Sequence, residues 1–281
     1  MAAKIDSHHH FWKYTTEAFG WIDDSMASLR RDFMPADLEA TIRETGVDGV
    51  VSVQARQSLE ETAFLLNLAD QNPFICGVVG WVPLISESVG DAIRQFSGNP
   101  KLRSFRHILQ GEADERYMLR DDFNRGIALL KEFNLAYDIL IFERHLPQTI
   151  EFVDRHPSQV FVLDHIAKPQ IHANLREPWA TQMKELAKRE NVYCKVSGMV
   201  TEADFKTWTE AQMQPYWETV LGAFGPKRLM FGSDWPVCLA AASYQRWYSL
   251  VQQFTASLSS SEQAEIFGET AIRAYQLKSP L

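Results

Sequence analysis

Two short stretches near opposite ends of the chain set the expected fold: Ile5-Asp6-Ser7-His8-His9-His10-Phe11-Trp12 and Met230-Phe231-Gly232-Ser233-Asp234-Trp235-Pro236. The first predicts a strand that ends in imidazoles, and the second predicts a strand that ends in a carboxylate. His8 and His10 are two residues apart, so on a strand they point to the same face and can share one metal or one substrate. A chain that closes into a barrel brings the two strand ends together, which indicates a hydrolase active site.

The histidine triplet has two plainer interpretations, an expression-tag remnant and a solvated structural cluster. A tag is usually longer and lies in a polar linker, whereas this triplet continues directly into Phe11 and Trp12. We therefore interpret His8 and His10 as functional and expect His9 to face the other way.

Composition bounds the class of protein. The chain has 281 residues, with 46% hydrophobic and 23% charged residues, which suits one globular domain over residues 1–281, because single α/β barrels often fill about 250 residues. The net charge of −8 argues against nucleic-acid and anionic-membrane partners. No apolar stretch approaches the roughly 20 residues of a membrane span, and the N-terminus lacks a signal-peptide pattern. Cys76, Cys194 and Cys238 form no CxxC pair, so we expect reduced thiols in a cytoplasmic protein.

Short apolar runs alternate with helical patterns along the chain. The expected strands are Lys4–His8, Gly49–Val53, Ile75–Val82, Leu102–Ile108, Tyr137–Phe142, Val160–His165, Val192–Ser197 and Leu229–Ser233. The expected helices are Asp37–Thr45 (closed by Gly46), Leu59–Ala69, Val89–Phe96, Phe123–Phe133, Thr149–Val153, Trp179–Ala187, Tyr216–Phe224 and Glu262–Ala274.

Eight such units predict an α/β protein with a (β/α)₈ TIM-type barrel, because continuous apolar strands alternating with helices form a parallel sheet that is covered on its outside. An open doubly wound sheet is the competing architecture, but it usually carries a Gly-rich phosphate loop after the first strand, where this chain has histidines. The segment 14–33 lacks periodicity. We expect it to be a loop over the barrel mouth, with Phe19, Trp21 and Met26 available to line a pocket.

Chemistry in barrel enzymes sits at the carboxyl ends of the strands. The polar and aromatic residues at or just after the expected ends are His8, His10, Gln54, Arg56, Trp81, Arg106, His107, Glu143, Arg144, His145, Asp164, His165, Lys168, Lys195, Ser197, Asp234 and Trp235. Polar groups buried there without partners would cost a few kcal/mol each. The pattern as a whole therefore indicates a site, although each residue alone is a weak signal.

These motifs resemble those of the amidohydrolase superfamily, in particular the lactonase and decarboxylase-like branch called amidohydrolase family 2. The matching motifs are Asp6-x-His8-x-His10-Phe11-Trp12, Arg106-His107-x-x-Gln110, Asp164-His165-x-x-Lys168-Pro169, Lys195-x-Ser197-Gly198 and Gly232-Ser233-Asp234-Trp235-Pro236. Within the branch, the combination resembles sugar-acid lactonases of the L-fucono- and L-rhamnono-lactone type, and next pyrone-dicarboxylate lactonases.

The resemblance implies a residue-by-residue assignment. His8, His10, His165 and Asp234 match the constellation that holds one divalent metal, commonly zinc, in many members. Strand four offers Arg106 and His107 where two-metal members have a bridging lysine, so we expect at most one metal, and lactonases of this branch can also work without one. Asp234 is then the general base and later the acid, while a metal or a cationic group such as His107 polarises the lactone carbonyl. His165 orients water or ligates the metal.

Several of these residues also have structural interpretations. Asp234 could cap a helix, His107 could be a hydrogen-bonded structural residue, and Lys195 could pair with a carboxylate inside the barrel. Trp12, Trp81 and Trp235 could belong to the core, although aromatic faces at a barrel mouth suit a sugar ring. The substrate-binding candidates are Trp12, Gln54, Trp81, Arg106, Lys195 and Trp235.

The expected partner is a small-molecule sugar lactone, with a homo-oligomer left open. A pyrone dicarboxylate would require arginines that converge on its carboxylates, and the strand ends offer Arg56, Arg106 and Arg144. The acidic balance and the Trp, Gln and His residues suit a neutral polyol better. A metal-dependent decarboxylase on the same scaffold and a barrel that binds a sugar acid without turnover are the alternatives, which the fold alone does not separate.

Overall fold

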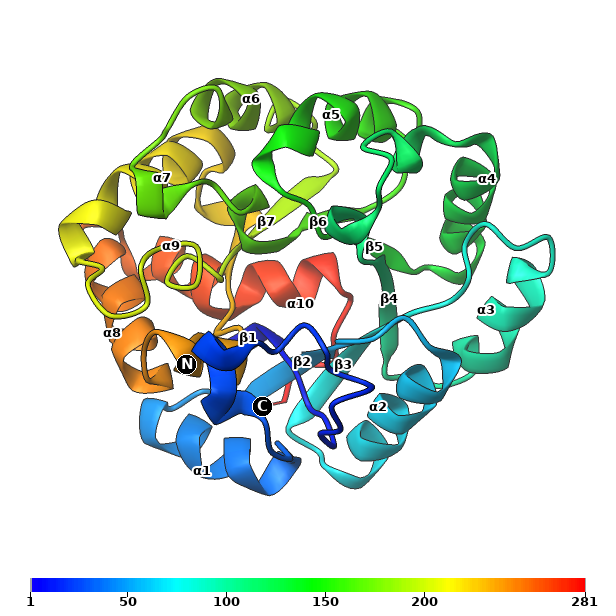
Figure 1. Ribbon diagram of the computed structural model, residues 1–281, viewed down its shortest axis with the longest axis horizontal. Helices are drawn as coiled ribbons and strands as arrows, with labels where there is room; N and C mark the ends of the chain where they lie inside the picture. Colours follow the sequence, from blue (N-terminus) through cyan, green and yellow to red (C-terminus); the bar gives the residue numbers. More distant parts are fainter. Residues whose placement is uncertain (1, 281) are drawn as a thin grey trace.

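The computed structural model describes residues 2–280, in which eight parallel strands form a ring surrounded by helices (Figure 1). The strands are Ile5–His9 (β1), Gly49–Val53 (β2), Ile75–Gly80 (β3), Leu102–His107 (β4), Ala136–Ile139 (β5), Phe161–Leu163 (β6), Val192–Val196 (β7) and Leu229–Phe231 (β8). Each strand pairs in parallel with the next strand along the chain. This order confirms the (β/α)₈ barrel and does not fit a doubly wound sheet, in which the strand order reverses.

Backbone hydrogen bonds join the first strand to the segment after the last strand. The amide of Asp234 donates to the carbonyl of His8 at 2.8 Å, and the amide of His10 donates to the carbonyl of Trp235 at 2.7 Å. The hydroxyl of Ser7 adds a bond to the carbonyl of Phe231 at 2.6 Å. The two motifs from opposite ends of the chain therefore lie side by side, as the sequence predicts.

The helices cover the outside of the ring. They are Pro35–Thr45 (α1), Leu59–Gln71 (α2), Val89–Ser97 (α3), Asp121–Leu130 (α4), Leu146–Asp154 (α5), Trp179–Leu186 (α6), Glu210–Phe224 (α7), Tyr244–Phe254 (α8), Ser260–Ala264 (α9) and Thr270–Ala274 (α10), with a π-helical turn, Glu265–Glu269, joining the last two. Gly46 ends α1 in the left-handed conformation, as expected. Helix α8 is absent from the sequence prediction, although Trp247, Leu250 and Val251 form its buried face at helical spacing.

Most predicted boundaries differ from the observed ones by a few residues, but the end of β6 differs in kind. The expected strand Val160–His165 stops at Leu163, and His165, Ile166, Ala167 and Lys168 then all have positive φ, between 48° and 61°. Left-handed backbone costs about 1–2 kcal/mol per non-glycine residue. His165 thus belongs to a strained turn, and strain of this kind is found mainly at functional sites. Strands β5 and β8 also end earlier than expected, at Ile139 and Phe231.

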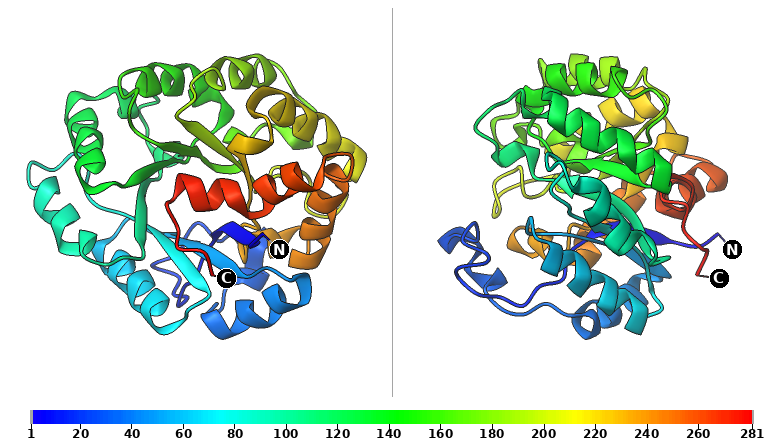
Figure 2. Two further views of the ribbon diagram at one scale, coloured as in Figure 1. Left: turned by 180° about the vertical axis from the view of Figure 1, so that it is seen from behind. Right: turned by 90° about the vertical axis from the view of Figure 1, so that its right-hand side faces the viewer.

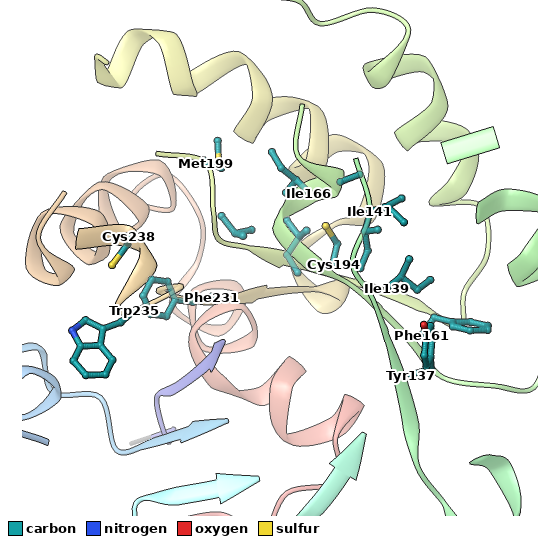
Figure 3. Packing of buried hydrophobic residues seen from close by; sticks show 14 of the residues in the cluster. Tyr137, Ile139, Ile141, Phe161, Ile166, Cys194, Met199, Phe231, Trp235 and Cys238 are labelled. Carbon is teal, nitrogen blue, oxygen red and sulfur yellow. The ribbon is translucent and has the colours of Figure 1, made fainter. Parts of the chain in front are cut away.

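The hydrophobic core lies between the strands and the helices (Figure 3). Tyr137 and Ile139 on β5 belong to it, whereas Asp138 between them points to the other side of the sheet, because side chains alternate along a strand. The three cysteines, Cys76, Cys194 and Cys238, are free and buried, in agreement with a packing role.

The two ends of the barrel are closed differently (Figure 2). The helical segment 260–274 crosses the end at which the chain begins and finishes, and the segment 14–33 lies at the opposite end. A short 3₁₀ helix, Asp24–Leu29, interrupts the expected loop in this segment. Within residues 2–280, none of the helices is long and apolar enough to cross a membrane.

Candidate active site

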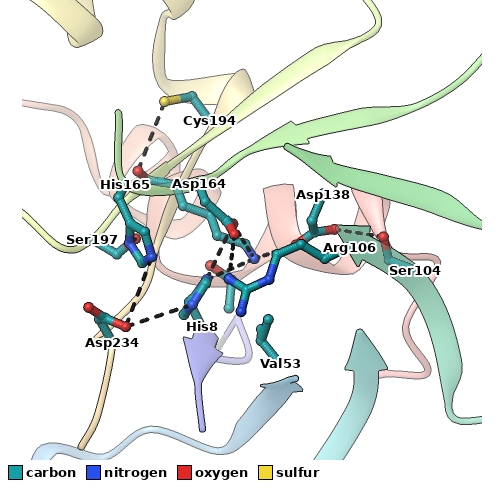
Figure 4. Close-up of polar contacts among 12 residues, drawn as sticks. His8, Val53, Ser104, Arg106, Asp138, Asp164, His165, Cys194, Ser197 and Asp234 are labelled. Atoms are coloured by element: carbon teal, nitrogen blue, oxygen red, sulfur yellow. Dashed lines mark hydrogen bonds and ion pairs between the residues drawn. The ribbon is translucent and has the colours of Figure 1, made fainter. Parts of the chain in front are cut away.

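Four buried side chains, those of His8, His10, His165 and Asp234, converge where the two terminal motifs meet. Figure 4 shows three of them, His8, His165 and Asp234. The Nε2 atoms of His8 and His10 are 3.2 Å apart. Oδ1 of Asp234 lies 3.8 Å from Nε2 of His8, 3.4 Å from Nε2 of His10 and 4.0 Å from Nε2 of His165. The structure therefore brings together three imidazole nitrogens and one carboxylate oxygen, the set that the sequence predicts.

The opposite nitrogen of each ring is held by the protein. Nδ1 of His10 is 2.7 Å from the carbonyl of Val53, which can only accept, so this ring carries its proton on Nδ1 and presents a lone pair at Nε2. Nδ1 of His165 is 2.8 Å from the hydroxyl of Ser197. Nδ1 of His8 lies 3.3 Å from Asp164 and 3.1 Å from the Lys195 ammonium. Such outer contacts fix the orientation of metal-binding or catalytic histidines.

A buried charge network lies beneath His8. The Lys195 ammonium is 2.6 Å from Asp138 and 2.9 Å from Asp164, and Arg106 donates to the second oxygen of Asp164 at 2.8 Å. Asp138 also accepts from the hydroxyls of Ser104 (2.6 Å) and Tyr275 (2.7 Å). The network links β4, β5, the end of β6, β7 and the residue after α10. Through Asp164 and Lys195 the network contacts Nδ1 of His8 and thereby fixes the orientation of that imidazole in the site.

The electrostatics of the site favour neutral imidazoles at His8 and His165 and an ionised carboxylate at Asp234. Burial lowers the pKa of His165 to about 4, and burial together with the Lys195 charge lowers the pKa of His8 well below its usual value. Burial alone would raise the pKa of Asp234, but His165 and His10 outweigh it, so its pKa lies below the usual range. At neutral pH Asp234 is therefore a carboxylate that can accept a proton.

This donor set fits a single divalent cation. Tetrahedral zinc with ligands at about 2.0–2.1 Å requires ligand atoms about 3.3 Å apart, close to the shorter separations here. Nε2 of His10 faces Nε2 of His8, and when His8 donates its Nδ1–H to Asp164 both Nε2 atoms are acceptors, so the two nitrogens would together suit a cation. The ligand atoms of His8, His10 and Asp234 lie within 4.8 Å of one another, and so do those of His8, Asp164 and His165. Asp164, however, is already engaged by Lys195 and Arg106, which leaves the first set as the better one.

Three residues predicted to contact substrate instead contact other protein groups in the interior of the barrel. Lys195 is fully buried, and its ammonium faces two aspartates and His8, so a direct substrate contact does not fit its placement. Gln54 is also fully buried, and its amide donates to the Arg106 carbonyl at 2.9 Å. The Arg106 guanidinium binds Asp164 and the Gln54 carbonyl. These residues hold β2, β4, β6 and β7 together below the site.

His107 and Trp81 pair with each other at the end of β4 and β3. The Trp81 indole N–H donates to Nδ1 of His107 at 3.4 Å, and Nε2–H of His107 donates to Glu112 at 2.6 Å. The ring of His107 stacks on Tyr117 at 5.0 Å between centroids. Burial lowers the pKa of His107 although Glu112 opposes this. Both ring nitrogens are occupied by protein groups, so the structural interpretation fits His107 better than polarisation of a carbonyl.

Trp12 and Trp235 are almost completely buried, at 1% and 3% exposed, in an aromatic cluster with Phe33. Trp12 and Phe19 also line a cavity of about 310 Å³, whose other walls include Arg56. Trp21, by contrast, is 43% exposed and stands edge-on to Trp12. Trp21 and Met26 are not among the residues that line this cavity, so only Phe19 of the three expected residues does so.

The substrate and catalytic candidates taken from the sequence omit Asp138 and Asp164, which carry the charge network. Each has a visible signal. Asp138 is a charged residue inside the apolar run 135–142, and Asp164 directly precedes a candidate histidine at a strand end. A charge in a buried strand demands a partner. The identity of that partner depends on the fold.

Comparison with known proteins settles the family. The amidohydrolase family matches residues 5–277, which is nearly the whole chain. The chain belongs to the amidohydrolase family. Among amidohydrolase relatives, the chain is 42% identical to an L-fucono-1,5-lactonase of Burkholderia multivorans over 290 aligned residues, covering 99% of this chain and 98% of that protein. It is 35% identical to an L-fucono-1,5-lactonase of Burkholderia ambifaria, covering 100% of this chain and 98% of that protein.

A solved amidohydrolase structure agrees with the fold. The crystal structure of an amidohydrolase from Burkholderia multivorans with bound zinc has a TM-score of 0.96 and 41% identity, covering 99% of this chain and 100% of that chain. The resemblance inferred from the motifs is therefore confirmed. That crystal structure contains bound zinc, and this amidohydrolase carries a His/Asp cluster whose geometry suits a metal ion.

Proposed function

We propose that this amidohydrolase hydrolyses a sugar-acid lactone of the L-fucono- or L-rhamnono-lactone type to the free aldonic acid. The observation that carries the proposal is the ionised, buried Asp234 facing the imidazoles of His8, His10 and His165 at the barrel mouth. The two L-fucono-1,5-lactonases to which the chain is similar over almost its full length support the substrate class. The protein is then a hydrolase that acts on a carboxylic ester bond.

Asp234 supplies the proton transfers in the proposed reaction. Its Oδ1 faces the histidines, while its Oδ2 forms no hydrogen bond to any residue between 2 and 280. The free oxygen can accept a proton from a water that attacks the lactone carbonyl, and the resulting acid can return the proton to the ring oxygen when the acyl–oxygen bond breaks. The backbone holds the carboxyl in place, because the Asp234 amide is bonded to His8 and its carbonyl accepts from the Cys238 amide.

A divalent metal would be held by His8, His10 and Asp234, and His165, whose Nε2 is 4.0 Å from Oδ1 of Asp234, would complete the ligand set. Zinc suits these nitrogen and oxygen ligands. When bound, such a cation supplies positive charge that polarises the lactone carbonyl. The protein contributes the orientation of the rings through Val53, Ser197 and the network under His8. It also shields the site from bulk solvent, since each of the four residues is at most 5% exposed.

The charges around the site favour a neutral polyol over a dicarboxylate. Each of the three arginines that could hold carboxylates already has an acidic partner. Arg56 is 2.7 Å from Glu61, Arg106 is 2.8 Å from Asp164, and Arg144 is 3.1 Å from Glu115. A dicarboxylate would have to displace these partners and leave their charges unpaired, whereas hydroxyl groups require no such exchange.

The test is hydrolysis of a lactone panel in weakly buffered medium with a pH indicator. The panel holds the lactones of L-fuconate, L-rhamnonate and L-galactonate beside 2-pyrone-4,6-dicarboxylate, assayed with protein as purified, chelated and reloaded with zinc. Asp234→Asn should lower kcat by about 10²–10⁴-fold, while Asp121→Asn, an exposed substitution in α4, should leave it unchanged.

Three results would overturn the proposal. Near-normal turnover by Asp234→Asn would refute the role of the carboxyl group. Hydrolysis of the pyrone dicarboxylate without hydrolysis of any sugar lactone would show that the proposed substrate class is wrong. Release of carbon dioxide from a hydroxybenzoate would place the protein among decarboxylases instead.

A further inference from the structure

Lys168 and Glu202 form a second pair of charges beside the site. Lys168 is the last residue of the left-handed turn after β6, and Glu202 lies in the loop after β7. The Lys168 ammonium is 3.7 Å from Oε1 of Glu202, and the side chains are 18% and 20% exposed. Both groups have therefore lost most of their contact with water and still remain open on one side.

The pair lies close enough to the catalytic groups to affect them. The Lys168 charge lowers the pKa of Asp234 and of His165, although burial is the largest influence on both. Burial raises the pKa of Glu202, and the nearby Asp234 carboxylate raises it further, while Lys168 opposes the shift. The Lys168 amide donates to the carbonyl of His165 at 2.8 Å, so the strained turn that presents His165 also presents Lys168. The pair thus occupies the rim of the same site.

Three neighbouring loops hold this rim together. The His172 amide donates to the Glu202 carbonyl at 2.9 Å, which ties the loop after β6 to the loop after β7. The side-chain amide of Gln170 donates to the Glu143 carboxylate at 2.7 Å, which ties the loop after β6 to the loop after β5. The ring of Phe142 lies 5.6 Å from the Lys168 ammonium. The rim therefore combines two charged groups with an aromatic side chain, a combination that suits a sugar ring.

The nitrogen–oxygen distance between Lys168 and Glu202 is longer than a hydrogen bond, whereas the Lys195 distances are not. Lys195 reaches its carboxylates at 2.6 and 2.9 Å, whereas 3.7 Å exceeds a normal hydrogen bond. Among residues 2–280, no protein group forms a hydrogen bond with the Lys168 ammonium or with the Glu202 carboxylate. The ammonium has three donors and the carboxylate has several acceptor positions, all partly desolvated. Such groups gain most from a polar ligand that donates to one and accepts from the other.

We propose that Lys168 and Glu202 form the subsite that binds neighbouring hydroxyl groups of the substrate and so select a hydroxylated lactone. Lys168 donates to one hydroxyl oxygen, and Glu202 accepts from a hydroxyl proton. This inference rests on the proposed lactonase function, because it names the residues that bind the hydroxyl groups of the substrate of that reaction.

The test compares two six-membered lactones, L-fucono-1,5-lactone and δ-valerolactone, which has no hydroxyl group. The variants are Lys168→Met and Glu202→Gln, and Lys206→Met, an exposed lysine on the same loop as Glu202, is the control. We measure kcat and KM for the sugar lactone. For δ-valerolactone we measure kcat/KM, or its inhibition constant against the sugar lactone where turnover is slow.

Each subsite variant should lose about 10–100-fold in kcat/KM on the sugar lactone, the usual loss for one hydrogen bond to a charged group. The δ-valerolactone parameter should change less than about threefold, because that ligand has nothing for the pair to bind. The double variant should lose less than the product of the single losses, because both residues hold the same substrate.

Equal losses on both lactones would overturn the subsite and leave the lactonase function standing. Unchanged kinetics of both variants on the sugar lactone would do the same. Wild-type protein that hydrolyses no lactone would instead refute the proposed function and the inference with it. Circular dichroism of each variant identifies a misfolded protein, and Glu202→Asp, which keeps the charge, should recover part of the Glu202→Gln loss.

Discussion

Replacing Lys195 by methionine tests the buried charge network under His8. Methionine keeps most of the aliphatic volume of lysine, so the substitution removes the ammonium without opening a large cavity. Asp138 and Asp164 would then share only the Arg106 charge, which binds Asp164 alone. Breaking a buried ion pair by removing one partner costs about 3–5 kcal/mol.

The expected shift of the melting temperature follows from chain length. At about 2 cal/mol/K per residue, unfolding this chain of 281 residues has an entropy of about 0.6 kcal/mol/K. The loss therefore corresponds to a fall in Tm of about 5–9 °C, measured by thermal unfolding. Lys184→Met, an exposed substitution in α6, should shift Tm by less than about 1 °C. Adding Asp138→Asn to Lys195→Met should recover part of the loss, because it removes one uncompensated charge.

The loss of stability in Lys195→Met should also depend on pH. Burial raises the pKa of Asp138 above its usual 3.8, and Lys195 opposes this rise, so the pKa climbs further in Lys195→Met. A carboxyl whose pKa is raised in the folded state contributes stability that is complete below its unfolded pKa and is lost as the pH rises through its folded pKa. The Tm difference from wild type should therefore be small near pH 4 and should widen toward neutral pH. A Lys195→Met protein within 1 °C of wild type at every pH would refute the charge-compensation reasoning.

Further predictions concern the metal site and two glycines. His10→Ala should lower zinc affinity by at least about 10–100-fold, seen as a fall in zinc per chain by atomic absorption after dialysis against buffered zinc. Retention of one tightly bound zinc would exclude His10 as a ligand. Gly126→Ala in α4 should destabilise the protein by about 1–3 kcal/mol, because the new Cβ would lie 2.2 Å from the Leu84 carbonyl oxygen. Gly222→Ala in α7 meets no atom within 4 Å and should stabilise it by about 0.5–1 kcal/mol. Equal Tm shifts for the two glycine variants would show that helix propensity outweighs packing at Gly126.

The strands and the core of the site were predictable because their signals are local. Apolar runs of strand length recur with helical patterns between them, and a parallel barrel gathers the carboxyl ends of all its strands at one end. The two-residue spacing of His8 and His10 places them on one face, and Asp234 follows the last strand. Topology then brings these residues together without knowledge of any particular contact.

The roles of Lys195, Arg106 and His107 required the tertiary structure. Each could have contacted substrate or protein, and the choice depends on carboxylates that lie far away in the sequence or around a turn. Lys195 pairs with Asp138, 57 residues away, and Arg106 pairs with Asp164, 58 residues away. No local pattern ranks such partners, because the distance and burial that decide between them exist only after the strands have assembled.

The turn at residues 165–168 shows the same division most clearly. The sequence alone determined that a histidine lies at the end of the sixth apolar run, and it placed His165 as the last residue of that strand. Ile166 and Ala167 disfavour the left-handed backbone that they adopt, so local preference argues against the turn. Only the packed barrel, which holds His165 against Ser197 and Asp234, offsets that local cost and aims the imidazole and Lys168 at the site.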